Sequence, residues 1–197
     1  MTRENSILEK VLRKHVKASE EEIQYALQIG DIRKYNKGDH FLTPATVCNK
    51  IGFIESGIAM IYRLETDQKK GVMEFYSEGE YITDFYSYIK KEHCLFHIVF
   101  LEDTVVFEYE REEILQKFRQ SLHWERYGRV TSESAYVKIM QQVYDNKFYN
   151  LEERYLRLIN DRSELFQRVP LYLIASYLNT TPETISRIRR NLYNNAK

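Results

Sequence analysis

Cysteine is scarce in this 197-residue sequence, which contains only Cys48 and Cys94. Two cysteines are too few for a disulfide framework, and no metal-ligand pairing accompanies them. The sequence also lacks a recognisable signal peptide and any apolar run near the ~20 residues that cross a bilayer. These absences predict a protein of the reducing cytoplasm that has no membrane partner.

The motifs of common enzyme classes are missing too. There is no phosphate-binding loop, no nucleophile–base motif and no paired acidic signature. A metal enzyme on a cupin-like roll usually needs a His-x-His, which does not occur here. His93 and His97 are four residues apart, but neither a helical context nor a suitably spaced carboxylate supports a metal pair. We therefore predict a non-enzyme without a metal or cofactor.

Net charge is also absent, because 29 basic residues balance 29 acidic ones. Its distribution is uneven. Between Phe166 and Lys197 there is one acidic residue, Glu183, against five basic residues: Arg168, Arg187, Arg189, Arg190 and Lys197. A basic C-terminal segment on an acidic body is typical of DNA-binding proteins, although four charges alone are weak evidence.

The sequence changes in character along its length. Residues 6–29 have helical periodicity, and Ser19 with Glu22 forms a capping-box pattern. Between Asp31 and Glu110, apolar or alternating runs are separated by glycine turns, which predicts a β-sandwich or barrel. These runs include residues 51–54, 58–62, 72–75, 97–100 and 105–107. From Arg111 onward the pattern is helical, so we expect two domains.

The helix predicted between Ser121 and Asp145 has apolar residues seven positions apart. Its candidate dimer seam consists of Val130, Ser134, Val137, Gln141 and Tyr144. A seven-residue spacing suits packing against a partner helix, which favours a homodimer. Because Ser134 and Gln141 are polar, the alternative is a helix that packs on its own domain. A further helix is predicted from Leu151 to Ile159, after a possible hinge at 146–150.

The segment from Arg168 to Leu192 predicts two short helices joined by a tight turn. Pro170 suits the first turn of a helix with an apolar face at Leu171, Ile174, Ala175 and Leu178. Asn179 tolerates the left-handed conformation that ends a helix. Thr181 and Pro182 then read as an N-cap and first helical position. This arrangement describes a helix-turn-helix.

The second helix would present its polar side to the major groove. Glu183 can accept a hydrogen bond from cytosine, and Arg187 can donate two to guanine. Arg168, Arg189 and Arg190 are better placed to contact phosphates. The full set of candidate DNA-binding residues is Arg168, Thr181, Glu183, Thr184, Ser186, Arg187, Arg189 and Arg190. The alternative is that Glu183 and Arg187 only pair with each other on an exposed helix.

This segment resembles the helix-turn-helix of the Crp/Fnr family of bacterial regulators. The resemblance lies in Leu-Ile-Ala-Ser-Tyr-Leu at 173–178 and Thr-Pro-Glu-Thr-Ile-Ser-Arg-Ile-Arg-Arg at 181–190. Tyr-Asn-Lys-Gly-Asp-His at 35–40, Phe-Ile-Glu-Ser-Gly at 53–57, Phe-Tyr-Ser-Glu-Gly-Glu at 75–80 and Leu-Glu-Asp-Thr at 101–104 resemble its β-roll. The likeness covers roughly residues 5–192 and is most specific in the C-terminal quarter.

The resemblance implies an α+β protein with three parts. Residues 1–120 would form a cyclic-nucleotide-binding-like, jelly-roll-like β-roll (a double-stranded β-helix), residues 121–147 a dimerisation helix, and residues 148–197 a winged helix-turn-helix. Glu183 and Arg187 fall where relatives read bases, and Thr184 where they touch a phosphate. Pro182 replaces a contacting arginine of some members, which puts the operator sequence in doubt. The implied partners are a two-fold symmetric duplex DNA, a second copy of the chain and RNA polymerase.

The effector site departs from the family pattern. Cyclic-nucleotide binders grip the phosphate with a Gly-Glu pair and an arginine, because an anion needs a positive charge and exposed N–H groups. Here Thr83-Asp84 stands at the Gly-Glu position, and no arginine occurs between Arg63 and Arg111. A cyclic-AMP pocket is therefore not expected. The cysteine cluster that holds iron–sulfur in oxygen-sensing members is also absent.

The candidate effector pocket is aromatic and consists of Tyr81, Thr83, Asp84, Phe85, Tyr86 and Phe96, with Tyr88 nearby. These side chains either fill the cavity or line a site for an apolar or ring-shaped ligand. We favour filling, because the sequence has 16 tyrosines. The sequence thus predicts a dimeric transcription regulator that responds to a ligand other than cyclic AMP or to none. The alternative is a sensing or protein-interaction module of the same fold that does not bind DNA specifically.

Overall fold

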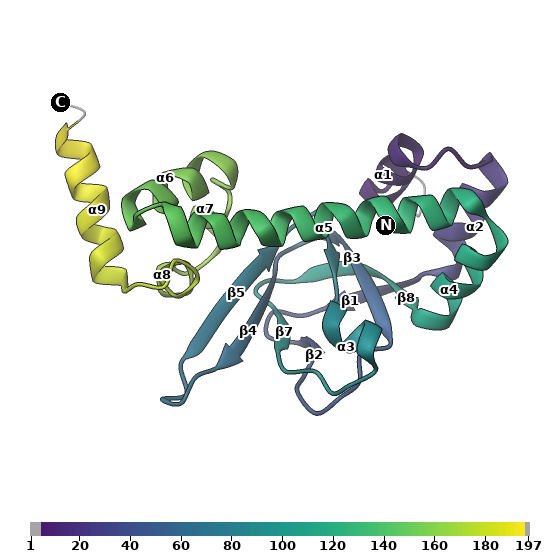
Figure 1. Cartoon of the computed structure of the whole chain (residues 1–197), viewed down its shortest axis with the longest axis horizontal. Coiled ribbons are helices and arrows are strands. Elements are labelled where there is room, and N and C mark those ends of the chain that lie inside the picture. Colours follow the sequence, from purple (N-terminus) through teal and green to yellow (C-terminus); the bar gives the residue numbers. More distant parts are fainter. Residues whose placement is uncertain (1–4, 196–197) are drawn as a thin grey trace. The chain divides into compact units, whose positions relative to one another are not determined.

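The computed structural model describes residues 5–195 as a mixture of helices and short strands (Figure 1). In chain order the elements are α1 (Ile7–His15), α2 (Glu20–Ile29), β1 (Asp31–Tyr35), β2 (His40–Leu42), β3 (Lys50–Ser56), β4 (Ala59–Leu64), β5 (Lys70–Tyr76), β6 (Tyr81–Ile82), α3 (Phe85–Lys90), β7 (His97–Phe100), β8 (Thr104–Glu110), α4 (Arg111–Gln120), α5 (Leu122–Phe148), α6 (Leu151–Asp161), α7 (Leu165–Arg168), α8 (Leu171–Tyr177) and α9 (Pro182–Asn195). The strand runs predicted from the sequence all fall in β3, β4, β5, β7 and β8.

The described residues divide into two compact units. The roll unit contains the residues up to Tyr62 together with Glu74–Glu133, and the helical unit contains Arg63–Met73 together with the residues from Ser134 onward. The long helix α5 passes from one unit into the other. The hairpin tip between β4 and β5 therefore belongs with the C-terminal helices, a grouping that no local sequence pattern predicts.

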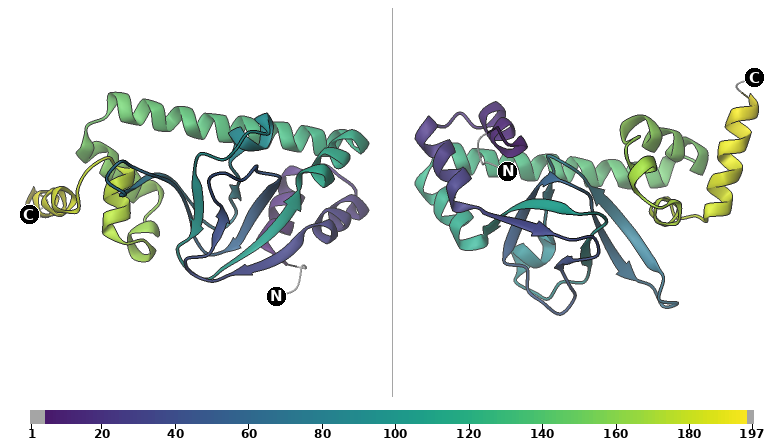
Figure 2. Two further views of the ribbon diagram at one scale, coloured as in Figure 1. Left: turned by 90° about the horizontal axis from the view of Figure 1, so that it is seen from below. Right: turned by 180° about the vertical axis from the view of Figure 1, so that it is seen from behind.

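Two four-stranded antiparallel sheets form the roll, in the orders β1-β8-β3-β6 and β2-β7-β4-β5. Figure 2 shows these strands from two further sides. The register pairs Phe53 with Phe107 in the first sheet and Met60 with Val99 in the second. Gly57 has a φ of +109°, and a Cβ there would overlap the Thr104 side chain. This tight turn requires glycine for both reasons.

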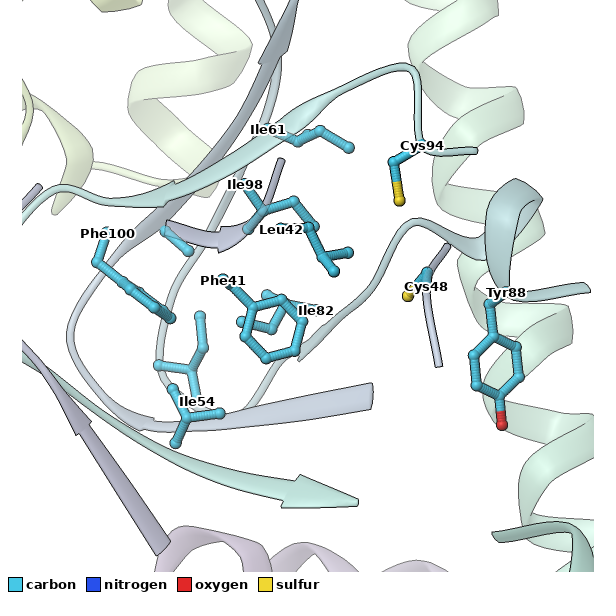
Figure 3. Close-up of a cluster of buried hydrophobic side chains, with 12 residues drawn as sticks. Phe41, Leu42, Cys48, Ile54, Ile61, Ile82, Tyr88, Cys94, Ile98 and Phe100 are labelled. Atoms are coloured by element: carbon cyan, nitrogen blue, oxygen red, sulfur yellow. The ribbon is translucent and has the colours of Figure 1, made fainter. Parts of the chain in front are cut away.

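Buried aliphatic and aromatic side chains fill the space between the sheets (Figure 3). The cluster consists of Phe41, Leu42, Cys48, Ile54, Ala59, Ile61, Ile82, Tyr88, Cys94, Ile98, Phe100 and Val106. They come from both sheets and from the segments on either side of α3. The interior of the roll is thus occupied by its own side chains.

A second cluster joins α1, α2 and the start of α5 to the roll. Trp124 is 6% exposed and meets the Tyr127 ring edge-on, with the ring centroids 6.1 Å apart. The buried Glu55 carboxylate accepts hydrogen bonds from the N–H groups of Ile7 and Leu8, at 2.6 and 3.1 Å. It thereby satisfies N–H groups that the first turn of α1 leaves without helical partners. The capping box predicted at Ser19 and Glu22 is confirmed.

The C-terminal residues are helical throughout their described part. From Ser134 to Asn195 no described residue forms a strand, so the wing predicted beside the helix-turn-helix is not found there. The segment between α6 and α8, where such a strand would precede the motif, instead contains the short helix α7. Leu165 of α7 is fully buried, and a helical turn allows this burial within four residues.

Candidate nucleic-acid interface and effector pocket

The turn between α8 and α9 has the geometry expected from the sequence. Asn179 adopts a φ of +54°, the left-handed conformation that ends a helix. The Thr181 hydroxyl accepts a hydrogen bond from the Thr184 N–H at 3.3 Å, as an N-cap side chain does. Pro182 is the first residue of α9. The predicted helix boundaries of this segment are thus reproduced.

The two helices meet through small and aliphatic side chains. Ala175 and Ile185 are fully buried, and Ile188 is 7% exposed. The methyl group of Ala175 allows the helices to approach closely. The apolar faces predicted for both helices are therefore the buried ones, and the opposite side of α9 is left to solvent.

That opposite side carries the candidate base-reading residues. Glu183, Arg187 and Arg190 lie three or four residues apart, so they share one face of α9, and all three are exposed. Among the described residues no ion pair joins Glu183 to Arg187, which removes the main support for the alternative of a self-paired helix. The backbone N–H of Glu183 and the Thr181 hydroxyl lower the pKa of the Glu183 carboxyl, which favours its charged, accepting form.

The other predicted DNA contacts are not all on that face. Arg189 is exposed but projects from another side of α9, where its charge acts on the Tyr155 hydroxyl. The Ser186 hydroxyl donates to the Pro182 carbonyl at 2.9 Å, within its own helix. Arg168 is half-buried at the end of α7. The structure brings together Glu183, Arg187 and Arg190, with Thr181 and Thr184 at the start of the helix.

The candidate dimer seam lies along α5. Val130, Val137 and Tyr144 are 41%, 64% and 48% exposed, and Ser134 and Gln141 between them are exposed as well. Phe148, which is 69% exposed, continues the same alternating spacing of three and four residues. The sequence interpretation placed Phe148 in a hinge, but α5 extends through it. An apolar seam with this exposure has no packing partner in a single chain.

The six candidate effector residues do not line one cavity. The Tyr81 hydroxyl is 2.9 Å from that of Tyr127 on α5, and Thr83 donates to the Lys50 carbonyl at 3.1 Å. Asp84 is buried as the N-cap of α3, where its carboxylate accepts the Ser87 N–H at 3.0 Å. Phe85 and Tyr86 are half-exposed, whereas Phe96 packs on the interior cluster. A cavity of about 400 Å³ beside β2 and the 43–49 segment contains none of the six in its lining.

A buried serine holds the segment around α3 together. The Ser87 hydroxyl accepts the Cys48 N–H at 2.9 Å and donates to the Glu92 carbonyl at 2.6 Å. The Cys94 thiol lies 3.4 Å from the same oxygen, and burial raises the pKa of this thiol. Figure 3 shows both sulfur atoms inside the cluster. The place where relatives keep a cationic side chain is thus occupied by neutral groups.

Tyr88 on α3 should be more useful to the protein as phenylalanine. It is 5% exposed, and its hydroxyl has no hydrogen-bond partner among the described residues. Because an unsatisfied buried hydroxyl is costly, Tyr88→Phe should raise the free energy of unfolding by about 1 kcal/mol at neutral pH. Denaturant titration measures this.

The same substitution should alter the alkaline limb of stability. Burial raises the pKa of Tyr88 to about 12, above its ordinary value of 10.0. Deprotonation therefore favours the unfolded chain, and stability falls as the pH rises from 10 towards 12. Tyr88→Phe should reduce that fall, whereas Tyr86→Phe, at a half-exposed position, should leave neutral stability unchanged. Equal effects of the two variants would contradict the assignment.

The histidine pair considered from the sequence is not arranged for metal binding. His97 on β7 stacks on Tyr62 with ring centroids 4.8 Å apart, and His40, not His93, lies next to it. No cluster of three or more histidine, cysteine or acidic side chains suited to a metal ion occurs within residues 5–195. None of the described helices is both long and apolar enough to cross a membrane.

Comparison with known proteins identifies the roll. Residues 32–121 match the family model of the cyclic nucleotide-binding domain. No curated protein sequence matches the chain. Among solved structures, the regulator CLP of Xanthomonas campestris, described as c-di-GMP responsive, has a TM-score of 0.70 at 16% identity, over 90% of this chain and 93% of its own.

Two further structures share the same fold. FixK2 from Bradyrhizobium japonicum has a TM-score of 0.69 at 14% identity, over 85% of this chain and 86% of its own. A putative Crp/Fnr-family regulator from Eubacterium rectale has a TM-score of 0.68 at 12% identity, over 92% and 86%. The predicted fold class, a β-roll followed by a helical region, is confirmed. So is the prediction that the roll is of the cyclic-nucleotide-binding type.

Proposed function

We propose that this chain, which has a cyclic nucleotide-binding domain at residues 32–121 and the fold of Crp/Fnr-family regulators, is a dimeric, sequence-specific DNA-binding transcription regulator. The observation that carries the proposal is the exposed face of α9 with Glu183, Arg187 and Arg190. These side chains are not committed to one another, so they are available to a ligand. We propose further that it acts in the cytoplasm as a non-enzyme and that RNA polymerase is a candidate partner.

The chemistry of this face fits duplex DNA. Arg187 can donate two hydrogen bonds to guanine O6 and N7, and the charged Glu183 can accept one from cytosine N4. Arg190 is one turn further along α9 and suits a phosphate. The residues 63–73 and 134–197 contain thirteen basic residues and eight acidic ones, whereas the rest of the chain is acidic. This charge asymmetry supports an anionic partner for the helical unit.

Dimerisation completes the proposal. Two recognition helices can contact two half-sites one helical turn apart only if a two-fold axis relates them. The exposed seam of Val130, Val137, Tyr144 and Phe148 gives α5 a surface for such a self-association. Its central residues lie at intervals of a coiled-coil repeat.

Binding-site selection from random duplexes with the purified protein tests the proposal. We expect a selected motif with two equal half-sites whose centres are about 34 Å, or one helical turn, apart. Recovery of sequences with no shared motif would favour the alternative, a sensing or protein-interaction module whose C-terminal helices do not read DNA.

Cyclic AMP should neither bind nor change DNA affinity. A cyclic phosphate needs a cation and free N–H groups, but Asp84 and Cys94 are buried at that place and no arginine occurs between Arg63 and Arg111. Calorimetric titration should therefore give no heat of binding at micromolar concentrations. A titration with c-di-GMP is informative in parallel, because the similar regulator CLP is described as responsive to it. Micromolar binding of cyclic AMP would overturn the proposed absence of a phosphate site.

A further inference from the structure

One serine connects the first helix of the candidate motif to the hairpin tip of the same unit. The Ser176 hydroxyl, on α8, accepts a hydrogen bond from the Val72 N–H at 3.0 Å. It donates one to the Lys70 carbonyl at 2.6 Å. A single hydroxyl therefore satisfies a donor and an acceptor of β5, more than 100 residues away in the chain.

The strand groups involved are those of a sheet edge. β5 is the last strand in the order β2-β7-β4-β5. In an antiparallel strand the N–H and C=O groups of alternate residues point to the same side, so Lys70 and Val72 present theirs together. On an edge strand these groups otherwise face solvent or another chain. Ser176 uses its hydroxyl as a neighbouring strand would use its backbone.

A second contact holds α8 from α5. The Gln142 side chain donates a hydrogen bond to the Tyr177 hydroxyl at 3.3 Å. Residues 134–148 of α5 carry most of the candidate dimer seam, and they lie in the same unit as α8 and α9. The direction of α9 relative to the seam is therefore set by how α8 is held between the hairpin tip and α5.

We propose that Ser176 is a positioning residue for DNA binding, which fixes α8 on the hairpin tip and thereby orients the recognition helix for a two-fold operator. This inference rests on the proposed function. It is a permissive contact and not an inhibitory one, because Glu183, Arg187 and Arg190 remain exposed while the hairpin tip is docked. Holding a binding surface in its bound geometry raises affinity by lowering the entropy lost on association.

The test compares Ser176→Ala with Ser176→Thr and with Ser163→Ala, which removes an exposed hydroxyl from the turn before α7. Two hydrogen bonds of net ~0.5–1.5 kcal/mol each predict a loss of DNA affinity of roughly three- to tenfold or more for Ser176→Ala. Base preference and salt dependence should not change, because Ser176 does not touch DNA. Ser176→Thr keeps the hydroxyl and should restore affinity, and Ser163→Ala should have no effect.

Amide hydrogen exchange at Val72 tests the contact without DNA. We expect faster exchange of this N–H in Ser176→Ala than in the wild type, with Ser176→Thr close to the wild type. Unchanged Val72 exchange would overturn the contact itself, and higher DNA affinity of Ser176→Ala would overturn its permissive role. If Ser176→Ala does not fold, the wild type suffices, because operator binding should preserve Val72 protection and a loss would contradict the proposal. Failure of the wild type to bind DNA would refute only the proposed function.

Discussion

Val137→Asp should convert the dimer into a monomer. Val137 lies in the middle of the α5 seam and is 64% exposed in the single chain. Two-fold symmetry would bring the two introduced carboxylates together at a buried interface, which costs about 3–5 kcal/mol. Sedimentation should show a dimer for the wild type at micromolar concentration and a monomer for the variant. DNA affinity should fall with it, because each monomer contacts one half-site.

Ile139→Asp is the matched control for this prediction. Ile139 is 57% exposed on the same helix, and the substitution introduces the same charge, but its side chain projects about 200° around the helix from that of Val137. It should leave the association state unchanged. Equal dissociation of both variants would place the contact elsewhere on α5, and a monomeric wild type would refute the dimer.

Arg187→Ala should relax the choice of one base pair in each half-site. Arg187 is exposed on the first half of α9, where it can reach a guanine edge, and its loss should cost about 1–3 kcal/mol on the selected operator. Arg190→Ala should instead weaken all sequences alike and reduce the slope of log affinity against log salt by about one. Competition binding against single-base operator variants at two salt concentrations separates the two outcomes.

Glu183→Ala is the internal comparison for these arginines. If its carboxylate reads a cytosine, its loss removes discrimination at a different base pair. Total affinity can then rise, since a negative charge leaves the DNA surface. Identical, sequence-independent losses for Arg187→Ala and Arg190→Ala would show that Arg187 only anchors a phosphate.

Features that depend on neighbouring residues could be predicted from the sequence. The stop at Asn179, the start at Thr181 and Pro182, and the capping box at Ser19 each depend on residues three or four positions apart. Such residues determine their own local conformation, so one sequence suffices. The glycine-punctuated strands of the roll were predictable for the same reason.

Features that depend on distant residues could not be predicted. The contact of Ser176 with Lys70 and Val72 spans more than 100 residues and uses backbone groups, which any residue possesses. The placement of the aromatic residues near α3 was also beyond sequence reasoning. Phe85 and Tyr86 are half-exposed, while Tyr81 bonds to Tyr127, because the six-residue helix α3 turns them to different sides. Composition alone indicated a pocket but not which side chains would enter it.

Trp124 makes one part of this molecule visible to spectroscopy. It is the only tryptophan in the sequence, and it is buried against Tyr127 where α1, α2 and α5 meet the roll. Intrinsic emission excited beyond tyrosine absorption therefore originates from this junction alone. It will follow the loosening of the N-terminal helices from the roll during denaturation. It gives no direct signal from α9, so a study of operator binding needs a fluorophore placed on the DNA.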